Sequence, residues 1–367
     1  MAPKKALRDR QEALGEVLKS SGLDVLLLTK RENVRYFTGF TGEDSYLLAG
    51  RGWMRLLTDS RFEEQARREC HWLEAYIRKD RMSLAVAAAL KRRRAKVLGV
   101  EGFYATVALV GALRKGLRGT RLKVLTDQVE NLRQVKQAGE MAKIRRAVGV
   151  AQQAFMQLTA GGRRAFIGRT ENELAAQLEY RMRQLGASRA SFETIVAAGA
   201  NAALPHYRPG SRRVGRDECV LIDWGAMVEG YCSDLTRVVF AGRIPPRIGR
   251  IYEVVLRAQA AGLAAIGPGV SCDKVDQAAR DVIVAAGYGD NFGHGLGHGV
   301  GLEVHEMPRL GRLSRTQLQP GMVVTVEPGI YLPGLGGVRI EDDACVTRRQ
   351  GRFLSDLPRD LRSMVLR

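Results

Sequence analysis

The stretch CVLIDWGAMVEGYCSDLTRVVF, residues 219–240, decides the fold of the second half of the chain. Its first arm opens with the β-rich run 220–222, and its second arm covers 231–240. Between the arms, Glu229 and Gly230 form a turn signal. The stretch therefore predicts two strands joined by a tight turn, a β-hairpin.

Each arm of this hairpin carries one carboxylate, Asp223 in the first and Asp234 in the second. A turn at residues 228–229 sets Asp234 opposite Asp223, whereas a turn at 229–230 sets it one diagonal step away on the same face. Two carboxylates in either of these positions would repel each other, and a bound multivalent cation would remove the repulsion. Two ordinary solvated acids on a hairpin are the alternative interpretation.

Length and composition are those of a globular protein with two domains. The 367 residues can form two cores, and 45% hydrophobic with 26% charged residues is an ordinary soluble balance. The first residues show no apolar signal-peptide core, and no run approaches the roughly 18 apolar residues of a membrane span. Five scattered cysteines without a CxxC pair predict reduced thiols and a cytoplasmic location.

The formal net charge of +19 raises the question of a nucleic-acid partner. The one compact basic block is 91–94, and the other basic residues occur as scattered pairs such as 212–213 and 348–349. Scattered positive charge is more typical of a soluble surface than of a recognition site. We therefore expect neither a nucleic-acid partner nor a membrane partner.

Helical and strand patterns alternate through the first 130 residues, which predicts a small α/β domain over 1–130. An amphipathic helix is expected at 6–20 and a loop at 33–42, NVRYFTGFTG. The expected strands cover 24–28, 46–49, 54–58, 97–100 and 122–125.

The second predicted domain, 131–367, begins within a helical pattern. That pattern runs from Asp127 to about residue 158, with Asp127 and Glu130 at capping-box spacing and weak points at Gly139 and Gly149. Further helices are expected at 171–185, 247–266 and 271–286, followed by a glycine-rich loop at 291–301 and a β-rich region to about 346.

The glycine-rich loop continues as NFGHGLGHGVGLEVHE and contains His294, His298 and His305, three of the chain's five histidines. Its glycines disfavour a helix and let backbone approach whatever the imidazoles contact. Such crowding in a histidine-poor chain indicates a site more than a flexible loop with incidental histidines.

Two further acids lie on a second chain reversal. Glu327 follows the strand-like run 322–326, and Glu341 follows the turn at 332–337, 14 residues later (341 − 327). The reversal can place both carboxylates on one face. Taken alone, each glutamate is interpreted as a surface residue rather than as a ligand.

Together these segments supply four carboxylates and one imidazole: Asp223, Asp234, His298, Glu327 and Glu341. Such a set suits Mn, Co, Fe or Zn. Four carboxylates are more than one divalent ion needs, so two ions that share bridging carboxylates are the simplest interpretation. A two-metal site generates hydroxide at neutral pH and stabilises the oxyanion formed at a carbonyl. His305 and His206 are then expected to donate to the tetrahedral intermediate or to the substrate's end. For His206 taken alone, the favoured interpretation is an ordinary loop histidine.

The order of these motifs resembles the "pita-bread" metallopeptidases, in the branch of Xaa-Pro dipeptidases (prolidases) and aminopeptidase P. The resemblance covers nearly the whole chain and is carried by PHY at 205–207, IDWG at 222–225, GYCSDLTR at 230–237, GHGVG at 297–301, VHEMPR at 304–309, VEPG at 326–329 and RIED at 339–342. The amino-terminal NVRYFTGFTG and TDSRF resemble the creatinase-type domain of that branch. The implied fold is α+β, a pita-bread catalytic domain preceded by a smaller α/β creatinase-type domain.

The resemblance also implies roles for single residues. Asp223 would hold one metal, His298 and Glu327 the other, and Asp234 and Glu341 would bridge them. Glu327 would also act as the proton shuttle. His206, His294 and His305 would bind substrate and stabilise the intermediate, and Arg339 would orient a bridging ligand or the proline end. Arg309 would receive the substrate's carboxylate, and Trp224 would shape the pocket. A plain surface charge is the alternative for both arginines.

The expected function is therefore hydrolysis of the bond before proline by a cytoplasmic dimetal Xaa-Pro dipeptidase, which the family suggests is a homodimer. An Xaa-Pro aminopeptidase acting on longer peptides is the alternative within the branch. A non-catalytic binding module and a creatinase-like amidinohydrolase are alternatives from other classes, and the intact set of five ligands argues against both.

Overall fold

The computed structural model describes residues 5–367, and the chain divides into two compact units, Met1–Arg133 and Gln134–Arg367. The sequence places its domain boundary after residue 130, and the structure divides the chain a few residues later, near the end of helix α6 (Gln128–Gln134). Each unit has its own buried apolar cluster.

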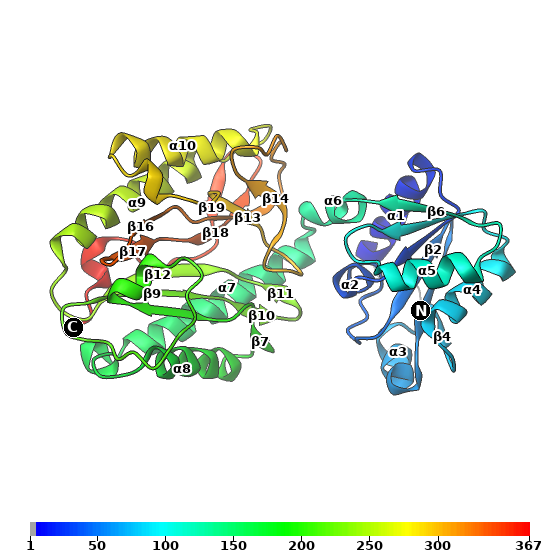
Figure 1. Ribbon diagram of the computed structural model, residues 1–367, viewed down its shortest axis with the longest axis horizontal. Helices are drawn as coiled ribbons and strands as arrows, with labels where there is room; N and C mark the ends of the chain where they lie inside the picture. Colours follow the sequence, from blue (N-terminus) through cyan, green and yellow to red (C-terminus); the bar gives the residue numbers. More distant parts are fainter. Residues whose placement is uncertain (1–4) are drawn as a thin grey trace. The chain divides into compact units, whose positions relative to one another are not determined.

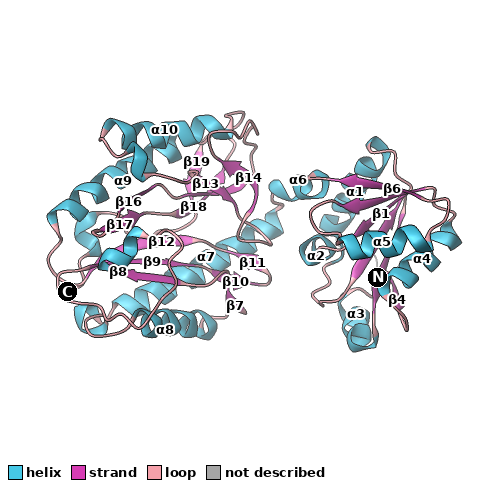
Figure 2. Cartoon of the chain, in the orientation of Figure 1, coloured by secondary structure: helices cyan, strands magenta, loops and turns pink. Residues whose placement is uncertain are grey.

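The first unit is built on a six-stranded mixed sheet with the order β4-β3-β2-β1-β5-β6 (Figures 1 and 2). The pairs β1–β5, β5–β6 and β3–β4 are parallel, whereas β1–β2 and β2–β3 are antiparallel. Its elements are α1 (Lys5–Ser20), β1 (Val25–Leu28), α2 (Arg31–Thr38), β2 (Tyr46–Gly50), β3 (Trp53–Thr58), η1 (Ser60–Phe62), α3 (Glu63–Glu69), β4 (Glu74–Ile77), α4 (Met82–Arg93), β5 (Val97–Glu101), α5 (Val107–Gly116) and β6 (Arg121–Leu125).

The prediction of a loop at 33–42 is wrong over its first half, because helix α2 occupies Arg31–Thr38. Tyr36 and Phe37 are buried on this helix, so tertiary packing outweighs the low helix propensity of its aromatic and β-branched residues. The helix ends at Gly39, whose φ of 79° gives the left-handed conformation typical of a helix terminus.

The helical pattern from Asp127 to 158 is two helices, α6 and α7 (Ala138–Thr159), rather than one. The break is at 135–137, and neither predicted weak point, Gly139 nor Gly149, interrupts α7. Val135 forms a bridge with Met322, and the N–H of Lys136 donates to the Gly321 carbonyl at 2.9 Å. Pairing with a distant segment therefore breaks the helix, which no local signal could indicate.

In the second unit, small antiparallel sheets lie between α7 and α8 on one side and α9 and α10 on the other (Figure 1). Its remaining elements are η2 (Gly162–Ala165), α8 (Glu171–Gln184), β7 (Arg189–Ala190), β8 (Ile195–Ala198), η3 (Gly199–Ala203), β9 (Cys219–Trp224), β10 (Ala226–Val228), β11 (Tyr231–Cys232), β12 (Leu235–Phe240), α9 (Pro246–Ala265), α10 (Cys272–Ala285), η4 (Gly289–Asn291), β13 (Gly297–Gly299), β14 (Glu306–Leu310), β15 (Val323–Val326), β16 (Gly329–Leu332), β17 (Gly336–Arg339), β18 (Asp342–Val346), β19 (Gly351–Phe353) and η5 (Leu361–Met364).

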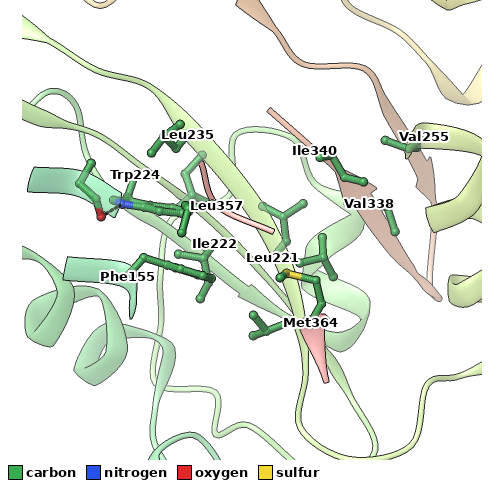
Figure 3. Close-up of a cluster of buried hydrophobic side chains, with 14 of the residues drawn as sticks. Phe155, Leu221, Ile222, Trp224, Leu235, Val255, Val338, Ile340, Leu357 and Met364 are labelled. Atoms are coloured by element: carbon green, nitrogen blue, oxygen red, sulfur yellow. Dashed lines mark hydrogen bonds between the residues drawn. The ribbon is translucent and has the colours of Figure 1, made fainter. Parts of the chain in front are cut away.

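Trp224 belongs to the core and not to a substrate pocket (Figure 3). Its ring stacks on Phe155 with a centroid distance of 4.6 Å, and its indole N–H donates to the Ala151 carbonyl at 2.9 Å. The expectation that Trp224 shapes the pocket is therefore wrong. Neighbouring residues of a strand face opposite ways, so Asp223 points to the other face of β9.

A buried ion pair joins β12 to the strand that follows Glu341. Arg237 and Asp342 have fully buried side chains, and their nitrogen and oxygen atoms lie 2.9 Å apart. Arg237 also donates to the carbonyls of Glu341, at 2.7 Å, and Pro358, at 2.9 Å. The guanidinium thus connects three segments that are distant in sequence.

Replacing Arg237 by methionine is expected to lower the free energy of unfolding by about 3–5 kcal/mol, because it removes the buried one of the two cations that pair with Asp342 and leaves only the partly exposed Arg359. Urea denaturation measures this loss. The control is Arg243→Met, since the Arg243 side chain is 91% exposed and its pair with Asp217 is worth at most about 1 kcal/mol. Equal losses in the two variants would contradict the prediction.

Within residues 5–367, no helix has the length and apolarity needed to span a bilayer. The five cysteines are free and buried.

Candidate metal centre

The first carboxylate pair is set by the register of the organising hairpin. In the β9–β12 ladder Asp223 lies opposite Thr236, and in the β10–β11 ladder Val228 lies opposite Tyr231. The turn residues are therefore Glu229 and Gly230, with φ of 48° and 80°. Asp234 lies two residues before Thr236, so it is one diagonal step from Asp223, the second of the two predicted registers.

The second carboxylate pair, Glu327 and Glu341, lies on the second chain reversal. Val326 pairs with Asp342 in β15–β18, and Gly329 pairs with Arg339 in β16–β17. This continuous register places Glu327 opposite Glu341, between the two ladders.

The two hairpins are joined through one residue of each. The N–H of Glu341 donates to the Thr236 carbonyl at 3.1 Å, and the Thr236 hydroxyl donates to the Glu341 carboxylate at 2.5 Å. Both carboxylate pairs therefore share one strand junction.

His298 approaches these carboxylates from β13, which pairs with β14 and β15. Its Nε2 lies 3.2 Å from a Glu327 oxygen and 3.7 Å from an Asp234 oxygen. Its Nδ1 lies 3.1 Å from the Gly299 carbonyl, an oxygen that only accepts, so Nδ1 carries a proton and Nε2 is directed at the carboxylates.

The predicted glycine-rich loop thus contains a strand. A Cβ on Gly297 would lie 2.2 Å from the Thr325 carbonyl oxygen, and one on Gly299 would lie 2.2 Å from the Met307 carbonyl oxygen. These glycines are required because neighbouring backbones pass so close, and they bring His298 near the hairpins.

The structure brings the five predicted ligands together in overlapping sets whose ligand atoms lie within 4.8 Å of one another. The sets are Asp223 with Asp234 and Glu341, His298 with Glu327 and Glu341, and Asp234 with His298 and His305. Glu341 is common to the first two sets, which makes it the natural shared ligand of two neighbouring ions.

The electrostatics of the cluster fit a bound cation. Burial, and then the neighbouring carboxylates, raise the pKa of Asp234 and of Glu341 well above the usual values. Burial opposes ionisation of Glu327 too, but the hydrogen bond and charge of His298 outweigh it and lower the pKa of Glu327. A buried oxygen of Asp223, Oδ1, has no hydrogen-bond partner within residues 5–367. Divalent cations would relieve this repulsion and satisfy that oxygen.

Arg339 is buried beside the cluster and contacts Asp223. Its guanidinium donates to Asp223 Oδ2 at 2.5 Å, to the Tyr331 hydroxyl at 2.7 Å, to Thr236 at 3.2 Å and to the Pro205 carbonyl at 3.5 Å. Arg339 is only 3% exposed. These contacts suit a residue that orients a ligand, and the ligand contacted is Asp223 rather than Asp234 or Glu341.

The remaining predicted residues surround the cluster. The His305 ring lies 4.2 Å from that of His298, and His294 Nε2 lies 2.9 Å from the Tyr331 hydroxyl. Desolvation and the charge of His298 lower the pKa of His305 to about 4, although the side chain is exposed, so its imidazole is neutral at physiological pH. His206 is exposed, yet close enough for its charge to contribute to lowering the pKa of His294 and of His305. Arg309 is exposed and lies opposite His298 in the β13–β14 ladder.

Sequence reasoning missed the residues that hold the ligands in place. Tyr331 connects His294 to Arg339, and the buried Asp343 accepts a hydrogen bond from the Asp234 N–H at 3.0 Å. Asp343 could have been found, since it lies two residues after Glu341 and therefore on the same face of the chain. Tyr331 lies in an ordinary apolar strand sequence and gives no such signal.

Comparison with known proteins gives two family matches. Residues 142–348 match the model "Metallopeptidase family M24", and residues 10–135 match "Creatinase/Prolidase N-terminal domain". The chain is 34% identical to the Xaa-Pro dipeptidase of Pyrococcus furiosus, covering 97% of this chain and all of that protein.

Solved structures agree with these matches. An Xaa-Pro dipeptidase from Bacillus anthracis superposes with a TM-score of 0.93 at 35% identity, covering 97% of this chain and 99% of the other. An X-Pro aminopeptidase from Thermotoga maritima gives 0.88 at 35% identity, covering 96% and 99%. The predicted α+β architecture with an amino-terminal creatinase-type domain is therefore confirmed.

Proposed function

Because the chain belongs to metallopeptidase family M24 and carries a creatinase/prolidase amino-terminal domain, we propose that it is a metal-dependent peptidase that hydrolyses the bond before proline in Xaa-Pro dipeptides. The similarity to Xaa-Pro dipeptidases over nearly the full chain supports this substrate. The observation that carries the proposal is the convergence of four carboxylates and His298 on one buried junction.

We propose that Asp223 belongs to one metal position, His298 and Glu327 to the other, and that Asp234 and Glu341 serve both. The oxygen-rich donors with one imidazole suit Mn, Co, Fe or Zn. Two divalent ions bound there would lower the pKa of a water molecule and polarise the scissile carbonyl.

The protein's own groups then handle the protons and the substrate. Glu327 accepts a proton from the attacking water and delivers it to the proline nitrogen as the C–N bond breaks. His305 and His206 donate hydrogen bonds to the developing oxyanion, and His294 binds substrate while Tyr331 fixes its ring. The neutral state of His305 leaves it one N–H to donate.

The test uses protein stripped of metal by chelation and reloaded with Mn or Co. Xaa-Pro dipeptides and longer Xaa-Pro peptides are then compared by the release of the amino-terminal residue. We expect metal-dependent hydrolysis, faster on dipeptides. A folded, metal-loaded sample inactive on both classes would refute the proposal.

Arg309 is expected to bind the carboxylate of the dipeptide's proline. Replacing Arg309 by alanine should raise KM for Xaa-Pro by about 10- to 100-fold, because a charge-assisted hydrogen bond is lost. KM for the corresponding Xaa-Pro amide, which has no carboxylate, should change little. Arg312→Ala, another exposed arginine nearby in the sequence, is the control. An equal rise for dipeptide and amide would count against this role.

A second candidate is an Xaa-Pro aminopeptidase, favoured by the similarity to the Thermotoga maritima enzyme. Preference for longer peptides in the same assay would select it. The intact acidic set argues against a non-catalytic module and against a creatinase-like enzyme. Metal analysis that finds no bound ion would point to the first, and product formation from creatine would point to the second.

We further propose a cytoplasmic homodimer. Five free buried cysteines suit a reducing compartment. Light scattering of the full chain tests the dimer.

A further inference from the structure

We infer that Glu171, at the start of helix α8 and outside the metal cluster, is the positioning residue for His206. This inference rests on the proposed function, in which His206 contacts the substrate. Glu171 is fully buried, and its four hydrogen bonds go to residues other than the five proposed ligands. Its carboxylate instead binds the segment 198–210, which carries His206; this segment is called the His206 loop below.

Four donors of the His206 loop converge on the two oxygens of Glu171. Oε1 accepts from the Ala198 N–H at 2.8 Å and from the Asn201 amide at 2.9 Å. Oε2 accepts from the Tyr207 hydroxyl at 2.8 Å and from the Gly210 N–H at 3.2 Å. An ionised carboxylate has about four lone-pair positions, so this one is saturated by a single loop.

The same loop is held on its other side by the elements that surround the metal cluster. The Pro205 carbonyl accepts from Arg339 at 3.5 Å, and Arg339 also binds Asp223. A Cβ on Gly337 would lie 2.2 Å from the Ala202 carbonyl oxygen, so the loop backbone lies directly against β17.

His206 therefore lies between two fixed points. Pro205, before it, is joined to Arg339, and Tyr207, after it, is joined to Glu171. The imidazole itself is exposed, so nothing comparable to core packing fixes it. Its position relative to His294 and His305 depends on the backbone, and Glu171 supplies four of the bonds that define that backbone.

The test begins with Glu171→Gln, which keeps shape but offers one acceptor oxygen in place of two. At least one donor of the loop then loses its acceptor. The matched control is Glu173→Gln on the same helix, because the carboxylate of Glu173 is exposed and contacts Thr170. Amide hydrogen exchange should accelerate in residues 198–210 of the Glu171→Gln variant but not in the Glu173→Gln variant. Exchange in β9 and β12 should be unchanged in both variants.

Kinetics then ask whether the effect passes through His206. Glu171→Gln should lower kcat/KM for Xaa-Pro by about 10- to 100-fold, since small misplacements of a substrate-binding group cost that much. In a His206→Ala background, the same substitution should cost less than about two-fold, because coupled residues are not additive. Metal stoichiometry measured by calorimetry should be unchanged in both backgrounds.

Two results would overturn the inference. One is an equal loss of kcat/KM from Glu171→Gln in the parent and in the His206→Ala background, and the other is unchanged amide hydrogen exchange in the His206 loop. If Glu171→Gln does not fold, Tyr207→Phe removes one of the four donors and enters the same cycle with the same criterion. A parent protein inactive on every Xaa-Pro peptide would refute the proposed function instead, and the exchange experiment would still decide whether Glu171 holds the loop.

Discussion

Replacing Asp234 by asparagine is expected to abolish peptide hydrolysis and yet leave the metal-free protein at least as stable as the metal-free parent. Asp234 is buried among Asp223, Glu327 and Glu341, and burial together with those charges raises its pKa well above the usual value. Without cations these carboxylates repel one another, so removing one charge relieves the folded state. With cations, the same substitution removes a proposed shared ligand, and kcat/KM should fall on the order of 10³-fold or more.

Chemical denaturation with and without Mn measures the stability, and hydrolysis of an Xaa-Pro dipeptide by the metal-loaded protein measures the activity. Metal at 100 times its dissociation constant stabilises the parent by about 2.7 kcal/mol, and Asp234→Asn should lose most of this increment. Asp281→Asn is the control, because Asp281 is exposed on α10. A fully active Asp234→Asn protein, or one that is less stable without metal, would contradict the assignment.

Replacing Arg339 by methionine should have the second largest effect, and its size should depend on metal. In metal-free protein the loss of unfolding free energy should be about 3–5 kcal/mol, because Asp223 then stays buried without its cation. In metal-loaded protein the loss should be smaller, since a bound ion compensates the same carboxylate. Activity should fall about 10²-fold, because Tyr331 and the His206 loop lose a shared anchor.

Arg339→Lys separates charge from shape. Lysine keeps the positive charge but lacks the planar fork that reaches Asp223 and Tyr331 together, so its stability should lie between those of the parent and the methionine variant. If the methionine variant loses equal stability with and without metal, Arg339 does not neutralise Asp223.

Much of the site could be predicted from the sequence because its register follows from strand periodicity. The turn signal at Glu229 and Gly230 limits Asp234 to two positions relative to Asp223, and the observed pairing is one of them. The reversal after Glu327 likewise places Glu341 opposite it. What joins the two hairpins, Thr236 with Glu341, is a contact between distant segments that no local pattern encodes.

The missed features share that cause. Helix α2 replaces a predicted loop because its aromatic residues are buried, and the break before α7 exists because Val135 pairs with Met322. Glu171 reads in the sequence as an ordinary acid in the first turn of a helix, where it favours the dipole. Only the folded chain shows that it binds four donors of another segment.

The close approach of backbones at Gly297 and Gly299 has a consequence for protein engineering. Exchanging glycine for alanine is a common route to thermostable variants, because it reduces the freedom of the unfolded chain. At these two positions an added methyl group would meet a carbonyl oxygen at 2.2 Å, so the exchange would push the neighbouring strands apart. Mutant libraries aimed at heat resistance should therefore keep both positions constant and take their diversity from exposed glycines with open space, such as Gly293.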